Sequence, residues 1–327
     1  MAGTFPAVEY DPVEDRLVAV DVPVPDPGAG DLLVEIAAVS VNPVDLKQKQ
    51  RHPKDAGRIR LGYDAVGRVR AVGEGVSGFA PGDRVWYAGD ATRPGTNGAL
   101  HLVDYRLVST APEGVSDEDA AAMPLTSITA WEAMFERMGY ATEGQGQAPM
   151  LMINGAGGVG SVALQLARRA GIAATATASR DESRDWCLRH GAAEVVDHAA
   201  LGDLADSAFG TIFCAHSTAH YLPEMARLVR PHGTIVSIVG APEPLDTLPL
   251  FRKSAAFAYE YMFARSLHNA EPERQGAILD RVARLMEAGE IVSTRTGTLQ
   301  GLTPETIGEA HRRNEAGGQI GKLVIVA

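Results

Sequence analysis

A cluster of glycines near the middle of the chain limits the possible folds more than any other feature. Residues 150–160 read MLMINGAGGVG, so Gly155, Gly157 and Gly160 match the pattern G-x-G-x-x-G. The first glycine permits a tight turn from strand to helix, the second lets the backbone approach a pyrophosphate, and the third lets helix and strand pack closely. Free N–H groups in the first helical turn attract phosphates. We therefore expect a dinucleotide-binding turn formed by Gly155, Gly157, Gly158, Val159 and Gly160.

The segments around this cluster have the pattern that such a turn requires. An apolar run at 150–154 precedes it, and a helical pattern at 159–170 follows it. Further strands and helices then alternate, with strands expected at 173–178, 194–196, 211–215 and 233–239 and helices at 182–190 and 222–229. Strands that alternate with helices of about ten residues indicate βαβ units in a parallel sheet.

The regions on either side are different, because they are rich in short strands. Apolar runs separated by Pro, Gly and Asp predict strands at 17–20, 32–39, 65–72 and 84–88. Ser116 is a plausible helix N-cap, and a helical pattern interrupted by Pro124 runs on to Met138. An amphipathic helix at 272–288 and a strand at 322–326 end the chain, while 47–60 and 88–100 are expected to be loops. The pattern predicts an α/β fold in which a parallel βαβ domain is inserted into a β-rich one.

The end of the second predicted strand bears on the choice of cofactor. A protein that prefers NAD carries Asp or Glu about twenty residues after the glycine motif, where the acid binds the ribose hydroxyls. Here the positions are Ser179 and Arg180, which can bind a 2′-phosphate and so favour NADP(H). Asp181 follows immediately, and a register shifted by one residue would make it the acid of an NAD site. A solvated surface arginine is the alternative interpretation of Arg180.

Composition and charge exclude several classes of function. Thirty basic and forty-one acidic residues give a net charge of −11, so we expect no nucleic-acid partner, which would need a basic face. Apolar runs fall short of the ~18 residues of a membrane helix, and the first residues lack the pattern of a secretory signal. Two cysteines, Cys187 and Cys214, cannot form a disulfide framework and are expected to pack in the core. We expect a cytoplasmic protein without a membrane partner.

Short motifs outside the glycine cluster carry a family resemblance over nearly the whole chain. They are VNPVD at 41–45, LGYDAVG at 61–67, PGDRV at 81–85, PLTSITAWE at 124–132 and IGKLV at 320–324. With these motifs in this order, the chain resembles the medium-chain dehydrogenase/reductase superfamily. More narrowly, it is similar to the zinc-independent quinone oxidoreductase branch, in the subgroup called zinc-type alcohol dehydrogenase-like.

The resemblance implies a domain organisation and an assembly. It implies a GroES-like catalytic domain over 1–122 and 263–327, interrupted by a Rossmann domain, a doubly wound parallel sheet, over 123–262. It also implies that the cofactor lies in the cleft and that a homodimer forms through the Rossmann domains.

The resemblance further implies which residues contact the cofactor and the substrate. Asn42 and Thr129 would line the nicotinamide end, and Val239 and Gly240 would contact its carboxamide. The residues implied at the adenosine 2′-phosphate are Ser179, Arg180 and His198, and Lys322 would lie near the cleft. The candidate catalytic residues are Tyr63, Asn42 and Asp45.

We expect no metal site. Zinc-dependent relatives carry a Cys in the loop that is 42–45 here and Gly-His-Glu where this chain has Gly62, Tyr63 and Asp64. A catalytic zinc needs three protein ligands and an open position, which Asp64 alone cannot supply. The spacing of Cys214, His216 and His220 resembles a metal pattern, but we expect these histidines in a polar loop after a strand.

Without a Lewis acid to polarise a carbonyl, conjugate reduction is the chemistry that needs least help. We expect transfer of hydride from NADPH to a quinone or an α,β-unsaturated carbonyl compound, with hydrogen bonds stabilising the developing oxyanion. Two other classes remain open: an enoyl reductase or tailoring enzyme of the polyketide or fatty-acyl type, and a non-catalytic NADPH-binding protein. The phenol of Tyr63, at the place of the missing histidine ligand, either donates to the substrate oxygen or fills the volume of the absent metal.

Overall fold

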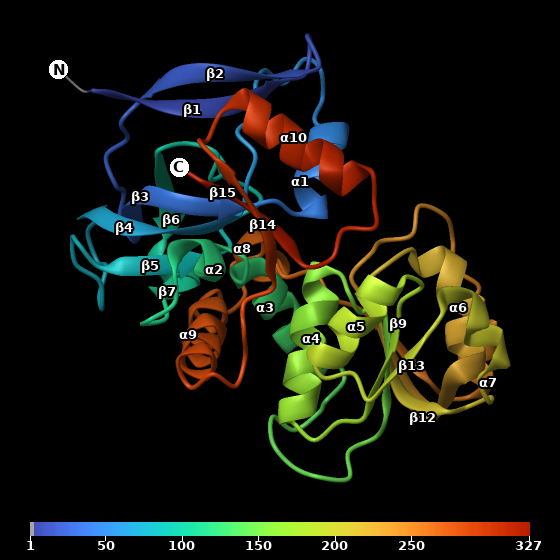
Figure 1. The fold of residues 1–327 in the computed structure, drawn as a ribbon. Coiled ribbons are helices and arrows are strands. Elements are labelled where there is room, and N and C mark those ends of the chain that lie inside the picture. Colours follow the sequence, from blue (N-terminus) through green and yellow to red (C-terminus); the bar gives the residue numbers. More distant parts are fainter. Residues whose placement is uncertain (1–2) are drawn as a thin grey trace. The chain divides into compact units, whose positions relative to one another are not determined.

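The computed structural model describes residues 3–327, which divide into two compact units. Unit 1 runs to Leu125 and resumes from Phe263 to Ala327, and unit 2 is Thr126–Met262. The chain therefore leaves the β-rich unit once and returns to it, with the parallel sheet inserted between (Figure 1). This confirms the expected α/β fold class.

Unit 1 is built on two sheets. Its larger, seven-stranded sheet has the order β14-β15-β3-β4-β5-β7, with β6 paired to β3, and β1 and β2 form a separate antiparallel pair. The strands are β1 (Thr4–Asp11), β2 (Arg16–Pro23), β3 (Asp31–Ser40), β4 (Asp64–Val72), β5 (Arg84–Tyr87), β6 (Leu100–Asp104), β7 (Ser109–Thr110), β14 (Arg295–Gln300) and β15 (Lys322–Val326). Every strand predicted for this unit is present. Its core includes the fully buried side chains of Leu32, Trp86 and Tyr87.

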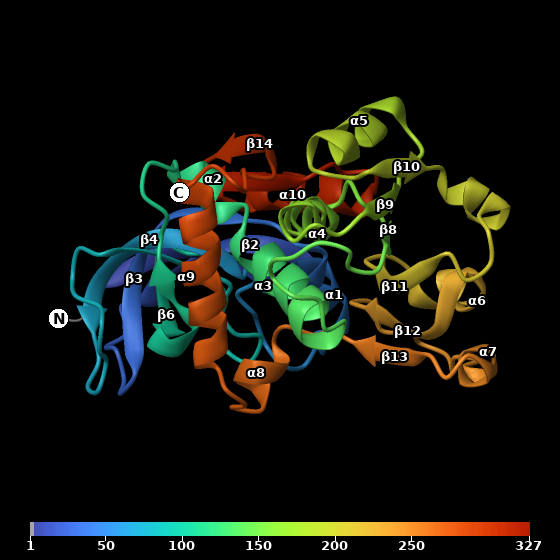
Figure 2. The ribbon, with the colours of Figure 1, turned by 90° about the horizontal axis from the view of Figure 1, so that it is seen from below.

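Helices cover parts of these sheets. They are α1 (Pro43–Arg51), the 3₁₀ helix η1 (Tyr105–Leu107), α2 (Asp117–Ala121), α8 (Ala264–Leu267), α9 (Glu273–Glu287) and α10 (Pro304–Glu315). The hydroxyl of Ser116 accepts a hydrogen bond from the N–H of Asp119 at 3.1 Å, which confirms the predicted N-cap of α2. The long amphipathic α9 (Figure 2) packs on η1, β7 and β5, and α10 packs on β2 and α1 (Figure 1).

The predicted loop at 47–60 is wrong for residues 47–51, because α1 continues to Arg51, whereas residues 52–60 do form a loop. The start of α1 has the residues that favour a helix: Asn42 as N-cap, Pro43 in the first turn, and Asp45 in a capping box with Asn42. The rest of the helix is mostly Leu, Lys, Gln and Arg, which lose little entropy in a helix. Only three of its nine residues are apolar, so hydrophobic periodicity alone did not show it.

Unit 2 is a six-stranded parallel sheet with the order β10-β9-β8-β11-β12-β13. Its strands are β8 (Met150–Ile153), β9 (Ala174–Thr177), β10 (Glu194–Val196), β11 (Phe209–Cys214), β12 (Val229–Ser237) and β13 (Ala256–Tyr259). Its helices are α3 (Pro124–Trp131, of which the first two residues belong to unit 1), the π-helix η2 (Glu132–Arg137), α4 (Gly158–Arg169), α5 (Asp181–Arg189), the 3₁₀ helix η3 (His198–Asp203), α6 (Thr218–Leu228) and α7 (Leu248–Arg252). The alternation predicted from the sequence is confirmed, although a π-helix replaces the end of the expected helix before Met138.

The packing of unit 2 follows from its buried strands. All four residues of β8 are fully buried, and α4 packs on β8 and β9 while α6 packs on β11 and β12. Figure 1 shows α4 and α6 on opposite faces of this sheet. Parallel strands present their carboxyl ends at one edge, where open α/β sheets bind ligands. No helix among residues 3–327 combines the length and the apolar character needed to cross a bilayer.

Candidate cofactor site and active site

The glycine turn lies between β8 and α4, as the motif predicts. Gly157 is the N-cap of α4, and no side chain caps the helix, so its first N–H groups remain available to a phosphate. A Cβ on Gly155 would lie 2.7 Å from the Cβ of Ala176, and one on Gly160 would lie 2.4 Å from the carbonyl oxygen of Asn154. These two glycines are therefore required for packing.

Gly157 is different, because its surroundings can adapt. The nearest atom to a Cβ there is Nδ2 of Asn154 at 2.9 Å, which is the end of a side chain. Asn154 itself has a φ of 70° and donates its backbone N–H to the hydroxyl of Thr177 at 2.8 Å. The turn is thereby attached to the end of β9. Its uncapped helix and the absence of a side chain at Gly157 fit a pyrophosphate.

Ser179 and Arg180 lie in the short loop after β9, and both are exposed. Asp181 is the first residue of α5, where its carboxylate favours the positive end of the helix dipole. The hydroxyl of Ser179 also bonds to Asp197, whose pKa is lowered first by the N–H of Ala199, at 2.8 Å, and further by this hydroxyl. Asp197 is a residue that the sequence analysis missed; it follows β10, and no motif distinguishes it.

His198 follows β10 and belongs to an aromatic cluster at the same sheet edge. Its Nδ1 lies 2.8 Å from the hydroxyl of Tyr221, whose ring also lies 4.7 Å from that of His220 and 6.4 Å from that of His216. Burial lowers the pKa of His198, and His216 and His220 lower it further, against the opposing effect of Asp197. His216 and His220 are exposed whereas Cys214 is buried, and His220 lies on α6 rather than in the loop predicted from the sequence. Residues 3–327 contain no group of three or more His, Cys, Asp or Glu side chains that could hold a metal ion.

The other cofactor candidates of unit 2 lie after β12 and on α3. The carbonyl of Val239 accepts a hydrogen bond from the hydroxyl of Thr218, and Gly240 is exposed with open space around its Cα. Thr129 lies on α3 and is 5% exposed. Val239 and Gly240 therefore share the carboxyl edge of the sheet with the glycine turn, whereas Asn42 and Lys322 belong to unit 1.

In unit 1, Asn42 and Lys322 belong to a buried polar network around Asp64. The oxygen Oδ2 of Asp64 accepts hydrogen bonds from the hydroxyl of Ser40 at 2.7 Å and from Nδ2 of Asn42 at 2.8 Å. It also forms an ion pair with Nζ of Lys322 at 3.1 Å, while Oδ1 accepts the backbone N–H of Leu125 at 2.7 Å. The side chains of Asp64 and Lys322 are 0% and 4% exposed. The sequence analysis named Asp64 only as an insufficient zinc ligand.

The ammonium of Lys322 uses all three of its N–H groups within this network. They go to the carbonyl oxygen of Val41 at 2.8 Å, to Oδ1 of Asn42 and to Asp64. Because Lys322 donates to Oδ1 of Asn42 and Asp64 accepts from Nδ2, the orientation of the Asn42 amide is fixed. The geometry makes Lys322 a residue that positions Asn42.

Asp45 stabilises the start of α1 from inside the protein. Its carboxylate accepts the N–H of Asn42 at 2.7 Å and the N–H of Gly62 at 3.0 Å, and the residue is 1% exposed. Burial raises the pKa of Asp45 to about 7, against the opposing effect of these N–H groups and of Lys322. Asp45 thus connects the Asn42 turn to the segment that carries Tyr63.

Tyr63 is 4% exposed, and its ring packs against Phe263 with the ring centroids 4.8 Å apart and the planes tilted by 54°. This is the geometry of an aromatic pair in a core. This packing is that of a core residue and gives no sign of an open hydroxyl in the site.

The donor set of unit 1 does not fit a catalytic zinc. Both oxygens of Asp64 already accept hydrogen bonds, and an ammonium lies 3.1 Å from Oδ2, where it would repel a metal cation. Asn42 uses its amide inside the same network, and Tyr63 is not a usual ligand. We therefore derive no step through a metal.

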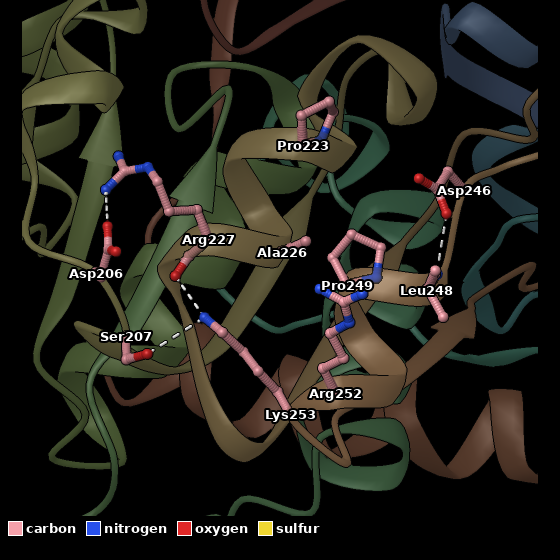
Figure 3. Close-up of a pocket in the computed structure, with 10 residues that line it drawn as sticks. All are labelled: Asp206, Ser207, Pro223, Ala226, Arg227, Asp246, Leu248, Pro249, Arg252 and Lys253. Carbon is pink, nitrogen blue, oxygen red and sulfur yellow. Dashed lines mark hydrogen bonds and ion pairs between the residues drawn. The ribbon is translucent and has the colours of Figure 1, made fainter.

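A separate pocket of about 550 Å³ lies within unit 2, between α6 and α7 (Figure 3). Its lysine, Lys253, donates to the hydroxyl of Ser207 at 3.2 Å and to the carbonyls of Arg227 and Val229 at 2.6 and 2.7 Å. Arg227 in turn forms an ion pair with Asp206 at 2.6 Å. Figure 3 shows Arg227 directed at Asp206 and Lys253 directed at Ser207 and the carbonyl of Arg227. By binding the last carbonyls of α6, Lys253 stabilises the carboxyl end of that helix.

Comparisons with known proteins agree on the family. The model of the alcohol dehydrogenase GroES-like domain matches residues 28–119, and that of the zinc-binding dehydrogenase matches residues 190–325. A zinc-type alcohol dehydrogenase-like protein of Staphylococcus aureus is 40% identical over 310 residues, which cover 92% of this chain and 92% of that protein.

Solved structures match over the full length. A candidate zinc-dependent alcohol dehydrogenase from Rhizobium etli superposes with a TM-score of 0.93 at 38% identity, covering 100% of this chain and 99% of its own. The quinone oxidoreductase of Escherichia coli, solved with NADPH, superposes with a TM-score of 0.82 at 21% identity, covering 98% of this chain and 100% of its own. At 21% identity, the match to the Escherichia coli protein shows a shared fold alone.

Proposed function

Because the chain belongs to the medium-chain dehydrogenase/reductase superfamily, as a zinc-type alcohol dehydrogenase-like protein, we propose that it reduces quinones or α,β-unsaturated carbonyl compounds with NADPH. The observation that carries the proposal is the buried network of Asp64, Asn42 and Lys322, whose donors do not fit a zinc ion. Conjugate reduction requires less polarisation of the carbonyl than direct reduction does.

NADPH supplies the hydride when it is bound. The uncapped first turn of α4 would bind its pyrophosphate, with Gly157 leaving room for it. Ser179 and Arg180 would bind the 2′-phosphate, both being exposed at the end of β9. Asn42 would contact the nicotinamide end, held in one orientation by Lys322.

The role of Tyr63 follows from its burial. Its ring packs on Phe263 and is 4% exposed, which favours the interpretation that it fills the volume of the absent metal site. Asp45 holds the turn at Asn42 and the backbone before Tyr63, so it acts through those residues. The proton of the reduced product would then come from water.

A panel of quinones, short enones and enoyl thioesters, scored by NADPH consumption, tests the proposed activity. We expect turnover of at least one class with NADPH. Tight NADPH binding without turnover of any compound would support the alternative of a non-catalytic binding protein, and turnover confined to thioesters would support an enoyl reductase.

The choice of NADPH is tested by Arg180→Ala. A charge-assisted hydrogen bond contributes ~1.5–3 kcal/mol, so the Kd for NADPH should rise ~10-fold or more. The Kd for NADH should change little, because NADH lacks the 2′-phosphate. Equal losses for both cofactors would contradict the role of Arg180.

We also propose that two copies associate through the edge strand β13. This strand ends the sheet of unit 2, and Phe251, Tyr259 and Tyr261 beside it are 79%, 45% and 47% exposed. A twofold axis would pair two such edges. Light scattering should show a dimer that Tyr259→Asp combined with Tyr261→Asp converts to a monomer. The control is Val13→Asp, at an apolar residue of unit 1 that is 75% exposed. A monomeric wild type would refute the proposal.

A cytoplasmic location completes the proposal. Cys187 and Cys214 are both free and buried, as expected in a reducing compartment. Cell fractionation tests it.

A further inference from the structure

Helix α1 begins at Asn42 and carries cations on its later turns. The segment from Lys47 to Arg60 holds six Lys and Arg residues, in a chain whose net charge is −11. Three of them form ion pairs with carboxylates of unit 1: Lys49 with Asp15, Arg58 with Asp11, and Arg60 with Glu9. Much of this positive charge is therefore neutralised locally.

Lys47 and Arg51 are not neutralised in this way. Within residues 3–327 neither side chain makes a hydrogen bond or an ion pair. They lie four residues apart on α1, so they share one face of the helix, where like charges repel each other. Lys47 is also half-buried, and its pKa is lowered by burial and then by Arg51, with no carboxylate opposing them.

A structural role explains only part of this arrangement. Arg51 lies in the last turn of α1, where a cation interacts favourably with the helix dipole. Lys47 lies nearer the middle of the helix and is partly removed from water without a compensating contact. An anion bound between the two side chains would supply the missing counter-charge.

We propose that Lys47 and Arg51 bind an anionic group, a phosphate or a carboxylate, that is carried by the substrate. At a rise of about 1.5 Å per residue, Lys47 lies about 7.5 Å and Arg51 about 13.5 Å along the helix axis from Asn42. The substrate would therefore be an unsaturated carbonyl compound with its charge roughly 10 Å from the reacting double bond. This inference rests on the proposed reductase activity.

Matched substrate pairs test the proposal in the double variant Lys47→Gln with Arg51→Gln. Crotonyl-coenzyme A and crotonyl-N-acetylcysteamine share the reacting thioester, and only the first carries phosphates. 11-Oxo-9-dodecenoate and its methyl ester differ in one carboxylate, which the extended chain places about 10 Å from the double bond, at the spacing of this pair. For at least one charged member, kcat/KM should fall about 10-fold or more, while its neutral partner changes by less than about twofold. The pair that responds identifies the anion as phosphate or carboxylate.

Three measurements distinguish substrate binding at this pair from cofactor binding, from a loss of stability and from a general effect of charge. The Kd for NADPH should be unchanged, since a loss there would show that the two cations bind the cofactor. The melting temperature should not fall, because Lys47 and Arg51 repel each other in the free protein. The control variant Arg70→Gln removes one charge from β4, about 20 Å along the strand from Asp64, and should change neither pair.

A binding assay keeps the inference testable if no compound is turned over. Equilibrium dialysis with coenzyme A and with 11-oxododecanoate, the saturated keto acid, should show that the wild type binds at least one of them and that the double variant binds it about 10-fold more weakly. No turnover with this binding intact would refute the proposed reductase and leave the anion site standing. Equal effects on charged and neutral substrates, or no binding of either anion, would refute the anion site.

Discussion

Replacing Lys322 by Met tests whether the buried network in unit 1 holds together as its contacts indicate. The ion pair of Lys322 and Asp64 is almost fully buried, and removing one partner of such a pair costs ~3–5 kcal/mol because the other charge stays unpaired. Asp64 would keep its bonds from Ser40, Asn42 and the backbone of Leu125, which reduces the loss. We therefore expect Lys322→Met to lower the free energy of unfolding by about 3 kcal/mol, at the lower end of that range.

The measurement should report on unit 1 alone, because a protein of two units need not unfold in a single two-state transition. Urea titration followed by peptide-resolved hydrogen exchange gives the free energy of opening for β3, β4 and β15. The double variant Asp64→Asn with Lys322→Met should lose at least ~1 kcal/mol less free energy of unfolding than the two single variants lose together, since the two residues are in direct contact.

An exposed pair provides the control. Arg313 and Glu309 are 2.7 Å apart on α10, with side chains 53% and 31% exposed. Arg313→Met should cost less than about 0.5 kcal/mol, as is usual for surface ion pairs. A loss below about 1 kcal/mol for Lys322→Met would refute the reasoning.

Four further predictions concern the glycine turn, the buried residues of unit 1 and the metal. Gly157→Val should abolish NADPH binding in a titration and leave the melting temperature unchanged. Gly160→Ala should lower the melting temperature, because the added Cβ would lie 2.4 Å from a carbonyl oxygen. The pKa of Asp45 is raised to about 7 in the folded protein, against ~3.9 in the unfolded chain. Its contribution to the free energy of unfolding is therefore complete below about pH 4 and is lost as the pH rises to about 7. Thermal unfolding of Asp45→Asn should therefore show a flatter profile in this window, and parallel profiles would contradict it. Tyr63→Phe should keep kcat within about threefold; a ~100-fold fall would instead show that the hydroxyl is a general acid. Prolonged chelation should leave activity and melting temperature unchanged, and one zinc held per chain in elemental analysis would overturn the ligand argument.

The elements that were predicted well from the sequence are those with a strong local pattern. The bounds of β10 and β15 agree with the prediction, and α4 and α9 each differ by one residue at either end. The apolar residues of α4 and α9 recur at the helix period, and β15 is an almost continuous apolar run. These patterns are evident within each segment, although β15 and α9 pack on strands far away in the chain, β3 and β5. The strand β1 was missed, because its apolar residues are mixed with Pro and charged residues.

Parts of the candidate site could be predicted because they follow a motif. The glycine turn and the residues after β9 lie where the βαβ pattern expects them, since a motif and its strand are contiguous in sequence. The Lys47 and Arg51 pair was not predicted. Its significance depends on burial and on the absence of a counter-charge among residues 3–327, which appear only in the folded chain.

The network around Asp64 shows what additional information the sequence would have needed. In the sheet, Val324 of β15 is paired with Ser40 of β3, and Ser40 is paired with Asp64 of β4. Lys322 lies two residues before Val324 and so on the same face of β15, because side chains alternate along a strand. The contact therefore follows directly from the register of three strands, and its two partners, Asp64 and Lys322, are 258 residues apart in the chain. A slip of β15 by one residue would turn Lys322 to the other face, leaving the buried Asp64 without its cation. The same burial that makes the ion pair costly to break thus also selects one register for the strand that ends the chain.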